Sequence, residues 1–117
     1  MKLSVVLAVY NEEKNLAECL RFVEHIADEI VVVDGGSTDK TVEIAQKFDA
    51  RIIETTNPPM FHINKQKAME SAKGDWILQL DADERVTPAL AKQIQDAVKG
   101  YPIEMLDVKK QNLFLRH

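Results

Sequence analysis

The sequence predicts an α/β fold in which helices flank a mostly parallel β-sheet. Apolar runs alternate with segments of helical periodicity along the 117-residue chain, and this alternation is typical of parallel strands joined by right-handed crossovers. Residues 3–9 and 29–33 are almost continuously apolar, as expected for central strands that are covered on both faces. Acidic turns follow several of the strands, at the edge where open α/β sheets bind ligands.

Two strand–helix units and a third strand are predicted in the first half of the chain. In order, they are a strand at residues 3–9, a helix at 11–27, a strand at 29–33, a helix that ends near 48 and a strand at 51–54. Glu12 and Glu13 lie at the amino end of the first helix, where the helix dipole favours acidic groups. In the turn that follows residue 33, glycines permit tight backbone geometry and Asp39 is expected to cap the next helix.

The second half begins with a loop, because Pro58 and Pro59 interrupt regular structure between residues 55 and 62. The elements predicted after it are a helix at 64–73, a strand at 76–80, a helix from 87 to 100 and one or two strands within 101–117. Thr87 is expected to cap the last helix, with proline at its first position. We expect one domain, residues 1–117, that is incomplete at its carboxyl end, because the pattern stops at a strand.

Charge and composition exclude several classes of protein. The net charge is −4 and the 15 lysines and arginines are scattered, so we expect no nucleic-acid partner. The single cysteine, Cys19, falls on the apolar face of a predicted helix, which indicates a buried thiol in a reducing compartment. Residues 1–9 are too short to span a membrane and lead directly into an acidic turn, so we expect a cytoplasmic protein without a signal peptide.

Two carboxylates, Asp81 and Asp83, directly follow the fourth predicted strand. Hard oxygen donors this close together favour Mg²⁺ or Mn²⁺, and such a cation takes phosphate oxygens as further ligands. Asp34 follows the second strand, and the turns after parallel strands lie on one edge of the sheet. Its carboxylate, beside a glycine turn, can accept hydrogen bonds from a uracil imide or from ribose hydroxyls. The sequence therefore predicts a site for a divalent cation and a nucleoside diphosphate at this edge of the sheet.

Three stretches of the chain resemble the leading motifs of family 2 glycosyltransferases, a large inverting family with the GT-A fold. They are VVLAVYNEE at residues 5–13, IVVVDGGSTDKT at 30–41 and GDWILQLDADE at 74–84. The resemblance covers almost the whole chain and implies a Rossmann-like GT-A domain that binds a nucleotide-diphospho-sugar. Within the family, residues 80–86 and 110–115 are most similar to bacterial enzymes that resemble lipopolysaccharide core β-glucosyltransferases.

Carried over by position, the resemblance also implies roles for single residues. The nucleoside pocket would be formed by Ala8, Val9, Tyr10, Glu12 and Asp34. Asp83 would bind the metal directly, while Asp81 would reach the ribose, or the metal through water. Lys65 matches a basic position near the diphosphate, whereas Gln66 departs from the asparagine expected beside it.

The resemblance implies transfer of a sugar, with inversion, from a nucleotide diphosphate such as UDP to the hydroxyl of a glycan or lipid-linked acceptor. The metal would stabilise the leaving diphosphate, and a carboxylate would remove the acceptor proton. In the family that general base lies well past the Asp-x-Asp turn, so we expect it beyond residue 117. A role in bacterial lipopolysaccharide or cell-surface glycan synthesis, with peripheral contact at the inner membrane, would follow.

Other functions were weighed against this one. An acidic turn alone is equally well a helix cap or a solvated loop. A phosphatase with Asp-x-Asp needs that motif after the first strand, a receiver domain needs an aspartate where Glu54 ends the third, and a dinucleotide oxidoreductase needs Gly-x-Gly-x-x-Gly. The open alternative is a non-catalytic nucleotide-sugar-binding module that lacks the base or completes its site with another chain. An exposed sheet edge could also pair with a second copy.

Overall fold

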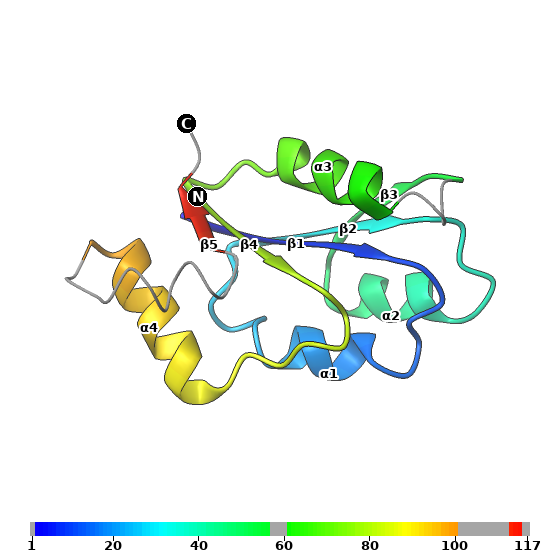
Figure 1. The fold of residues 1–117 in the computed structure, drawn as a ribbon. Helices are drawn as coiled ribbons and strands as arrows, with labels where there is room; N and C mark the ends of the chain where they lie inside the picture. Colours follow the sequence, from blue (N-terminus) through cyan, green and yellow to red (C-terminus); the bar gives the residue numbers. More distant parts are fainter. Residues whose placement is uncertain (1, 57–60, 101–112, 116–117) are drawn as a thin grey trace.

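The structure, a computed structural model, describes residues 2–56, 61–100 and 113–115. These residues form a sheet of five strands with helices on both faces (Figure 1). The elements are β1 Leu3–Val9, α1 Leu16–Arg21, β2 Glu29–Asp34, α2 Thr41–Lys47, β3 Arg51–Glu54, α3 Phe61–Ser71, β4 Trp76–Leu80, α4 Pro88–Val98 and β5 Leu113–Leu115. The strand order is β3-β2-β1-β4-β5, and only β5 runs antiparallel to its neighbour. The predicted mostly parallel sheet is confirmed.

The hydrophobic core has two parts, one on each face of the sheet. Alternate residues of β1, such as Val5 and Leu7, pack with α1, α2 and α4, whereas Val6 packs under α3. Two small side chains, Ala68 on α3 and Ala72 directly after it, are buried against the sheet and let this helix lie close to it. All seven residues of β1 are buried, which explains why its sequence is apolar throughout rather than alternating.

The first predicted helix is shorter than its periodicity indicates. It covers Leu16–Arg21 rather than residues 11–27. Asn11 has a left-handed backbone, φ 52°, which is not helical, and the N–H groups of the next two residues bond to Thr41 at the start of α2 and to Asp39 in the loop before it. After Arg21 the chain continues in turns that still bury Val23 and Ile26. The apolar spacing therefore predicted correctly which residues are buried, but not that the helix would be short.

The remaining elements lie close to their predicted positions. The third helix begins at Phe61, earlier than predicted, while residues 57–60 of the proline loop lie outside the described residues. Thr87 caps α4 by accepting a hydrogen bond from the N–H of Leu90 at 3.2 Å, as predicted. Of the strands expected within 101–117, Leu113–Leu115 is confirmed as β5; residues 101–112 are not described.

The described helices are short. None of them combines the length and the apolar content that a bilayer span requires. Two strands, β3 and β5, form the edges of the sheet, and pairing of an edge with a second copy stays a prediction.

A polar network joins the strands at the end of the sheet where β1 begins. Ser4 Oγ donates to Glu29 Oε2 at 2.5 Å and accepts from the N–H of Gly74 at 2.8 Å. The same carboxylate accepts from the N–H of Lys73 at 2.6 Å and pairs with Arg51 at 3.2 Å. Partial burial raises the pKa of the Glu29 carboxyl, but the hydrogen bonds from Ser4, Lys73 and Arg51 outweigh this effect and hold the pKa below its ordinary value.

Replacing Gly74 with alanine is expected to destabilise the fold. A Cβ atom there would lie 2.7 Å from Ser4 Oγ and 2.8 Å from Ser4 N, so β1 or the turn must shift, at a cost of about 1–3 kcal/mol in the free energy of unfolding. Urea unfolding of Gly74→Ala measures this cost. Asp75→Ala, at the exposed neighbouring position, is the control, and an equal loss in both variants would contradict the steric explanation.

Replacing Glu29 with glutamine is expected to lower the free energy of unfolding at about pH 7 and progressively less in acid. Because the folded-state pKa is depressed, the charged carboxylate stabilises the fold above its unfolded-state pKa, whose ordinary value is 4.5. That contribution is lost as the pH falls through the folded-state pKa. Urea midpoints of both proteins at about pH 7 and about pH 3 test this sign. A difference that does not shrink in acid would contradict it.

Candidate functional site

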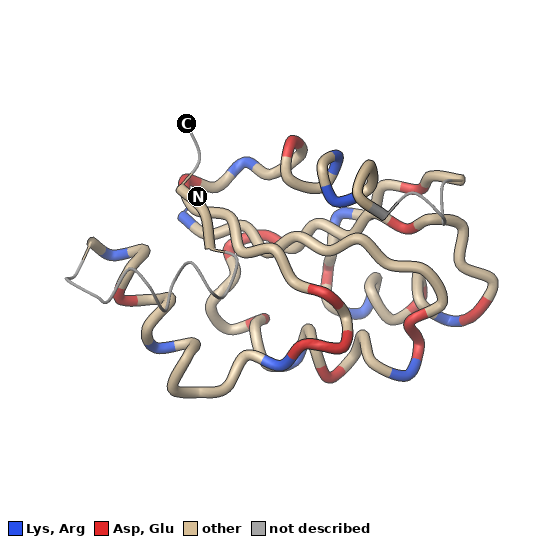
Figure 2. The backbone as a smooth tube through the Cα atoms, in the orientation of Figure 1, with Lys and Arg blue, Asp and Glu red and all other residues tan. Residues whose placement is uncertain are grey.

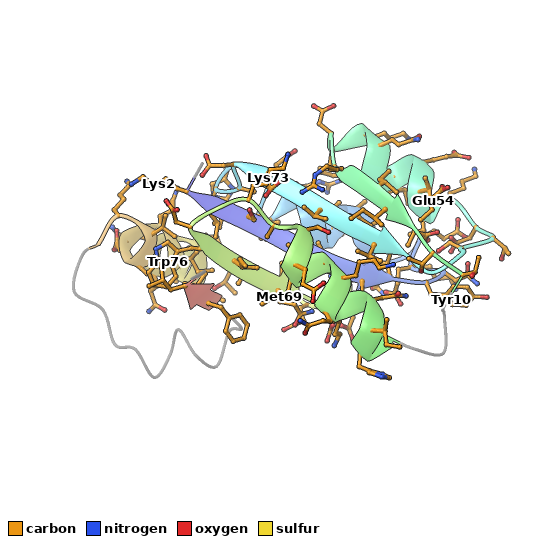
Figure 3. All side chains as sticks on the ribbon, turned by 90° about the horizontal axis from the view of Figure 1, so that it is seen from above. Lys2, Tyr10, Glu54, Met69, Lys73 and Trp76 are labelled. Carbon is orange, nitrogen blue, oxygen red and sulfur yellow. The ribbon has the colours of Figure 1, made fainter. Side chains whose placement is uncertain are left out.

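The carboxyl ends of β1, β2 and β4 meet at one end of the sheet, because these strands are parallel neighbours. Acidic residues occupy the loops that follow all three strands (Figure 2). Tyr10 and Glu54 lie at this end, whereas Lys2, Lys73 and Trp76 lie at the opposite end (Figure 3). The edge predicted from the sequence to bind a ligand is thus the one where acidic loops gather.

A cavity of about 320 Å³ opens at this edge, within the size range of small-molecule sites. Its described lining residues are Ala8, Glu12, Lys65, Asp81, Ala82 and Asp83. All of these except Ala82 are residues that the sequence predicts for the site. The structure therefore brings together residues from β1, from α3 and from the turn after β4, which are far apart along the chain.

Three predicted residues, Val9, Tyr10 and Asp34, lie at the same edge but do not line this cavity. The side chain of Val9 is fully buried in the core, and its carbonyl accepts a hydrogen bond from the N–H of Gly35 at 2.9 Å. Tyr10 is half-buried where β1 ends. Their contact with a nucleoside stays a prediction.

Asp34 shapes the loop after β2, a role that the sequence did not predict. Its side chain is buried, and Oδ2 accepts from the N–H groups of Gly36 and Ser37 at 3.1 and 3.0 Å. Oδ1 accepts from the Ser37 hydroxyl at 2.5 Å. Gly36 has φ +97°, a conformation that favours glycine. A carboxylate offers about four lone-pair sites, so this loop leaves about one for a ligand.

The loop after β1 is bonded to the loop after β2 and to the first residue of α2. The N–H groups of Asn11, Glu12 and Glu13 donate to the side chains of Ser37, Thr41 and Asp39 at 2.9, 2.9 and 3.2 Å, and that of Thr38 donates to the Asn11 side chain at 2.8 Å. Asp39 also accepts from the backbone N–H and hydroxyl of Thr41, the first residue of α2, although the N-cap position itself is Lys40, whose side chain makes no capping bond. Partial burial raises the pKa of Asp39, but these hydrogen bonds outweigh it and bring the pKa below its ordinary value.

The Asp-x-Asp turn is held by the two residues that follow it. Glu84 accepts from the N–H of Asp81 at 2.8 Å through its side chain and donates its own N–H to the Asp81 carbonyl at 2.9 Å. Arg85 donates to the carbonyl of Ala82 at 2.8 Å and to the Asn15 side chain at 3.3 Å. Sequence analysis missed Arg85 as a positioning residue, although its place directly after the motif was a usable signal.

Cys19, a buried residue of α1, also contacts the Asp-x-Asp turn. Its thiol donates to the Asp81 carbonyl at 3.7 Å. Burial raises the pKa of Cys19 to about 12, while the positive charge of Arg85 acts in the opposite direction. The thiol is therefore protonated at neutral pH and packs in the core, which confirms its predicted buried position.

Lys65 forms an ion pair inside the cavity. Its Nζ lies 3.0 Å from Asp81 Oδ1, and the two side chains are 39% and 49% exposed. Because the pair is this exposed, water screens it, and its contribution to stability is about 0–1 kcal/mol. The sequence predicted Lys65 and Asp81 separately as ligand-binding residues, but not their contact, because α3 and the turn after β4 meet only in the folded chain.

The donor set at this edge fits a cation that shares its coordination with phosphate. Among the residues that the structure describes, no three Asp, Glu, His or Cys side chains come together as a metal site. Asp81 and Asp83 nevertheless both line the cavity. One or two carboxylates, completed by phosphate oxygens and water, are how proteins commonly hold Mg²⁺.

Known sequences resemble this chain over most of its length. Residues 4–112 match the family model described as glycosyl transferase family 2. An uncharacterised glycosyltransferase of Rickettsia bellii is 35% identical over 114 residues, which cover 90% of this chain and 38% of that protein. LpsC of Rhizobium meliloti, a lipopolysaccharide core biosynthesis glycosyltransferase, is 34% identical over 104 residues, 82% of this chain and 37% of LpsC. The chain thus spans less than two-fifths of the length of these relatives.

Solved structures agree with these sequence matches. Staphylococcus aureus TarS 1–349 in complex with UDP superposes with a TM-score of 0.70 at 28% identity, over 85% of this chain and 31% of TarS. The mannosyltransferase PcManGT of Pyrobaculum calidifontis, in complex with GDP-Man and Mn²⁺, gives 0.70 at 26% identity, over 84% of this chain and 31% of its own. Because the family match covers nearly all of the sequence and the fold agrees with these enzymes, the chain belongs to glycosyl transferase family 2 and has the GT-A fold.

Proposed function

We propose that this chain forms the donor site of an inverting glycosyltransferase that moves a sugar from a UDP-sugar to an acceptor hydroxyl. The observation that carries the proposal is the cavity at the carboxyl ends of β1 and β4, where Asp81, Asp83 and Lys65 line one space. Carboxylates that can hold a cation, beside a lysine, suit a diphosphate better than an uncharged ligand.

Each lining residue has a chemical part in this proposal. Asp83 and Asp81 would hold Mg²⁺ or Mn²⁺, which supplies Lewis-acid stabilisation of the leaving diphosphate when bound. Lys65 would offer an ammonium group to the phosphate oxygens. Ala8, whose side chain is small, leaves room beside the acidic turn. The complexes of TarS with UDP and of PcManGT with GDP-Man and Mn²⁺ support a nucleotide and a metal of this kind.

The base preference of the donor would come from Asp34. Its carboxylate accepts hydrogen bonds from the loop and retains about one lone-pair site. Uracil carries an imide N–H that can donate to this site, whereas cytosine presents an acceptor at the same ring position. Asp34 would therefore favour a uridine donor over a cytidine donor.

The acceptor side of the reaction lies outside the described site. We propose a glycan or lipid-linked acceptor in bacterial lipopolysaccharide or cell-surface glycan synthesis, supported by the similarity to LpsC. The general base would lie beyond residue 117, and the protein would act in the cytoplasm with peripheral contact at the inner membrane. If the base is not supplied, the chain would bind donor without transferring sugar, which is the non-catalytic alternative.

Tight UDP binding is expected to require both a divalent cation and Asp83. Titration calorimetry of the chain with UDP, with and without Mn²⁺, tests this requirement. Asp83→Asn should weaken UDP binding in Mn²⁺ by at least about tenfold, since losing even an outer-shell partner of a metal costs that much. Asp75→Asn, an exposed carboxylate before β4, is the matched control. An unchanged UDP affinity when Mn²⁺ is left out, or an equal loss in the control, would sink the proposal.

UDP is expected to bind about tenfold or more tightly than CDP, because a hydrogen bond to a charged group contributes about 1.5–3 kcal/mol. Changing the ligand rather than Asp34 avoids damage to the loop that this residue holds together. Both titrations are run at the same Mn²⁺ concentration. Equal affinities would remove the base-reading role from Asp34 and leave the metal–diphosphate part untouched.

A further inference from the structure

We propose that Lys65 is an internal counter-ion, whose ammonium pairs with Asp81 until a divalent cation binds this carboxylate. The released ammonium then pairs with the diphosphate. The inference rests on the donor site proposed above. Its starting point is the contact of 3.0 Å between Lys65 Nζ and Asp81 Oδ1, with both residues lining the same cavity. The ammonium therefore stands against the carboxylate that a cation in this cavity would use.

The backbone on the lysine side of this pair is fixed. Asn64, which precedes Lys65, and Ala68, three residues after it, are fully buried, and Ala68 packs against the sheet. The Lys65 side chain itself is 39% exposed and carries its charge on a flexible four-carbon stem. The ammonium can therefore leave Asp81 by side-chain rotation while α3 stays in place.

The backbone on the aspartate side is fixed as well. The carbonyl of Asp81 accepts from the N–H of Glu84 at 2.9 Å and from the Cys19 thiol at 3.7 Å. Its N–H donates to the Glu84 carboxylate at 2.8 Å. A second donor, Gln79 Nε2, lies at 3.5 Å from Asp81 Oδ1, farther than the ammonium. A cation can thus replace the Lys65 ammonium at the Asp81 carboxylate without movement of the turn.

The strength of the ion pair suits this exchange. A pair as exposed as this one shifts an equilibrium by about fivefold at most. A divalent cation carries twice the charge of the ammonium and can displace it. The released ammonium remains within the cavity, where phosphate oxygens would accept its hydrogen bonds.

One residue would thereby couple the two ligands. Metal alone must displace Lys65, and UDP alone must draw Lys65 away and leave Asp81 unpaired, so each ligand makes binding of the other easier. Such coupling is reciprocal by thermodynamic necessity. Removing the ammonium should affect the two ligands in opposite directions, which an ordinary diphosphate contact would not do.

Lys65→Met is expected to bind Mn²⁺ alone about two- to fivefold more tightly than the unchanged chain, and to bind UDP alone more weakly. Mn²⁺ binding is followed by the electron paramagnetic resonance of the free ion, and UDP binding by calorimetry. Lys67→Met is the matched control, since it removes the same charge from an exposed position of α3 about 200° away around the helix. Urea midpoints verify that each variant is folded.

A double-mutant cycle separates ion pairing from general repulsion between two cations. In an Asp81→Asn background, Lys65→Met should leave residual Mn²⁺ binding unchanged if the effect passes through Asp81. The same gain in Mn²⁺ affinity in both backgrounds would overturn the inference. It would also be overturned if Lys65→Met binds Mn²⁺ no more tightly than the unchanged chain, provided that the unchanged chain binds Mn²⁺ and UDP together. If neither the unchanged chain nor any variant binds Mn²⁺, with or without UDP, the donor-site proposal itself fails.

Discussion

Burial of β1 on both faces and along both edges is the constraint on which this structure depends. All seven of its residues are buried, between the parallel strands β2 and β4 and between the helix layers. A strand in this position can expose polar groups only where it ends. The polar residues that follow β1 therefore lie at one rim of the sheet, the edge where the carboxyl ends of the parallel strands meet. The parallel neighbours deliver theirs to the same rim, and the cavity forms there.

The loops at this rim are fixed by bonds to one another as well as by bonds within each loop. Asn11 exchanges hydrogen bonds with the loop after β2, Cys19 supports the carbonyl of Asp81, and Arg85 reaches back to Asn15. Each bond joins segments that are distant along the chain, so the rim is assembled before any ligand arrives. A site held in this way keeps its carboxylates near productive positions without needing the ligand to order them.

The sequence identified most of the fold and much of the site, for reasons that can be traced to particular residues. Two-sided burial of β1 and β2 produces apolar runs that are visible in the sequence, and Thr87-Pro88 marks a helix start by local chemistry alone. The helix predicted at 11–27 was wrong in length: Asn11 has a left-handed backbone, and the next two N–H groups bond to Thr41, which opens α2, and to Asp39 before it. Local periodicity carries no information about such bonds.

The sequence by itself determined the α/β class, the strand that ends in Asp-x-Asp and the family resemblance, because these depend on local periodicity and on residues that are contiguous in the chain. Tertiary structure alone decided that Lys65 contacts Asp81, and that Ser4, itself bonded to Glu29, accepts a hydrogen bond from Gly74. Each of these contacts depends on the packing of separate elements against the sheet. Spacing along one chain does not encode the distances between atoms on different elements.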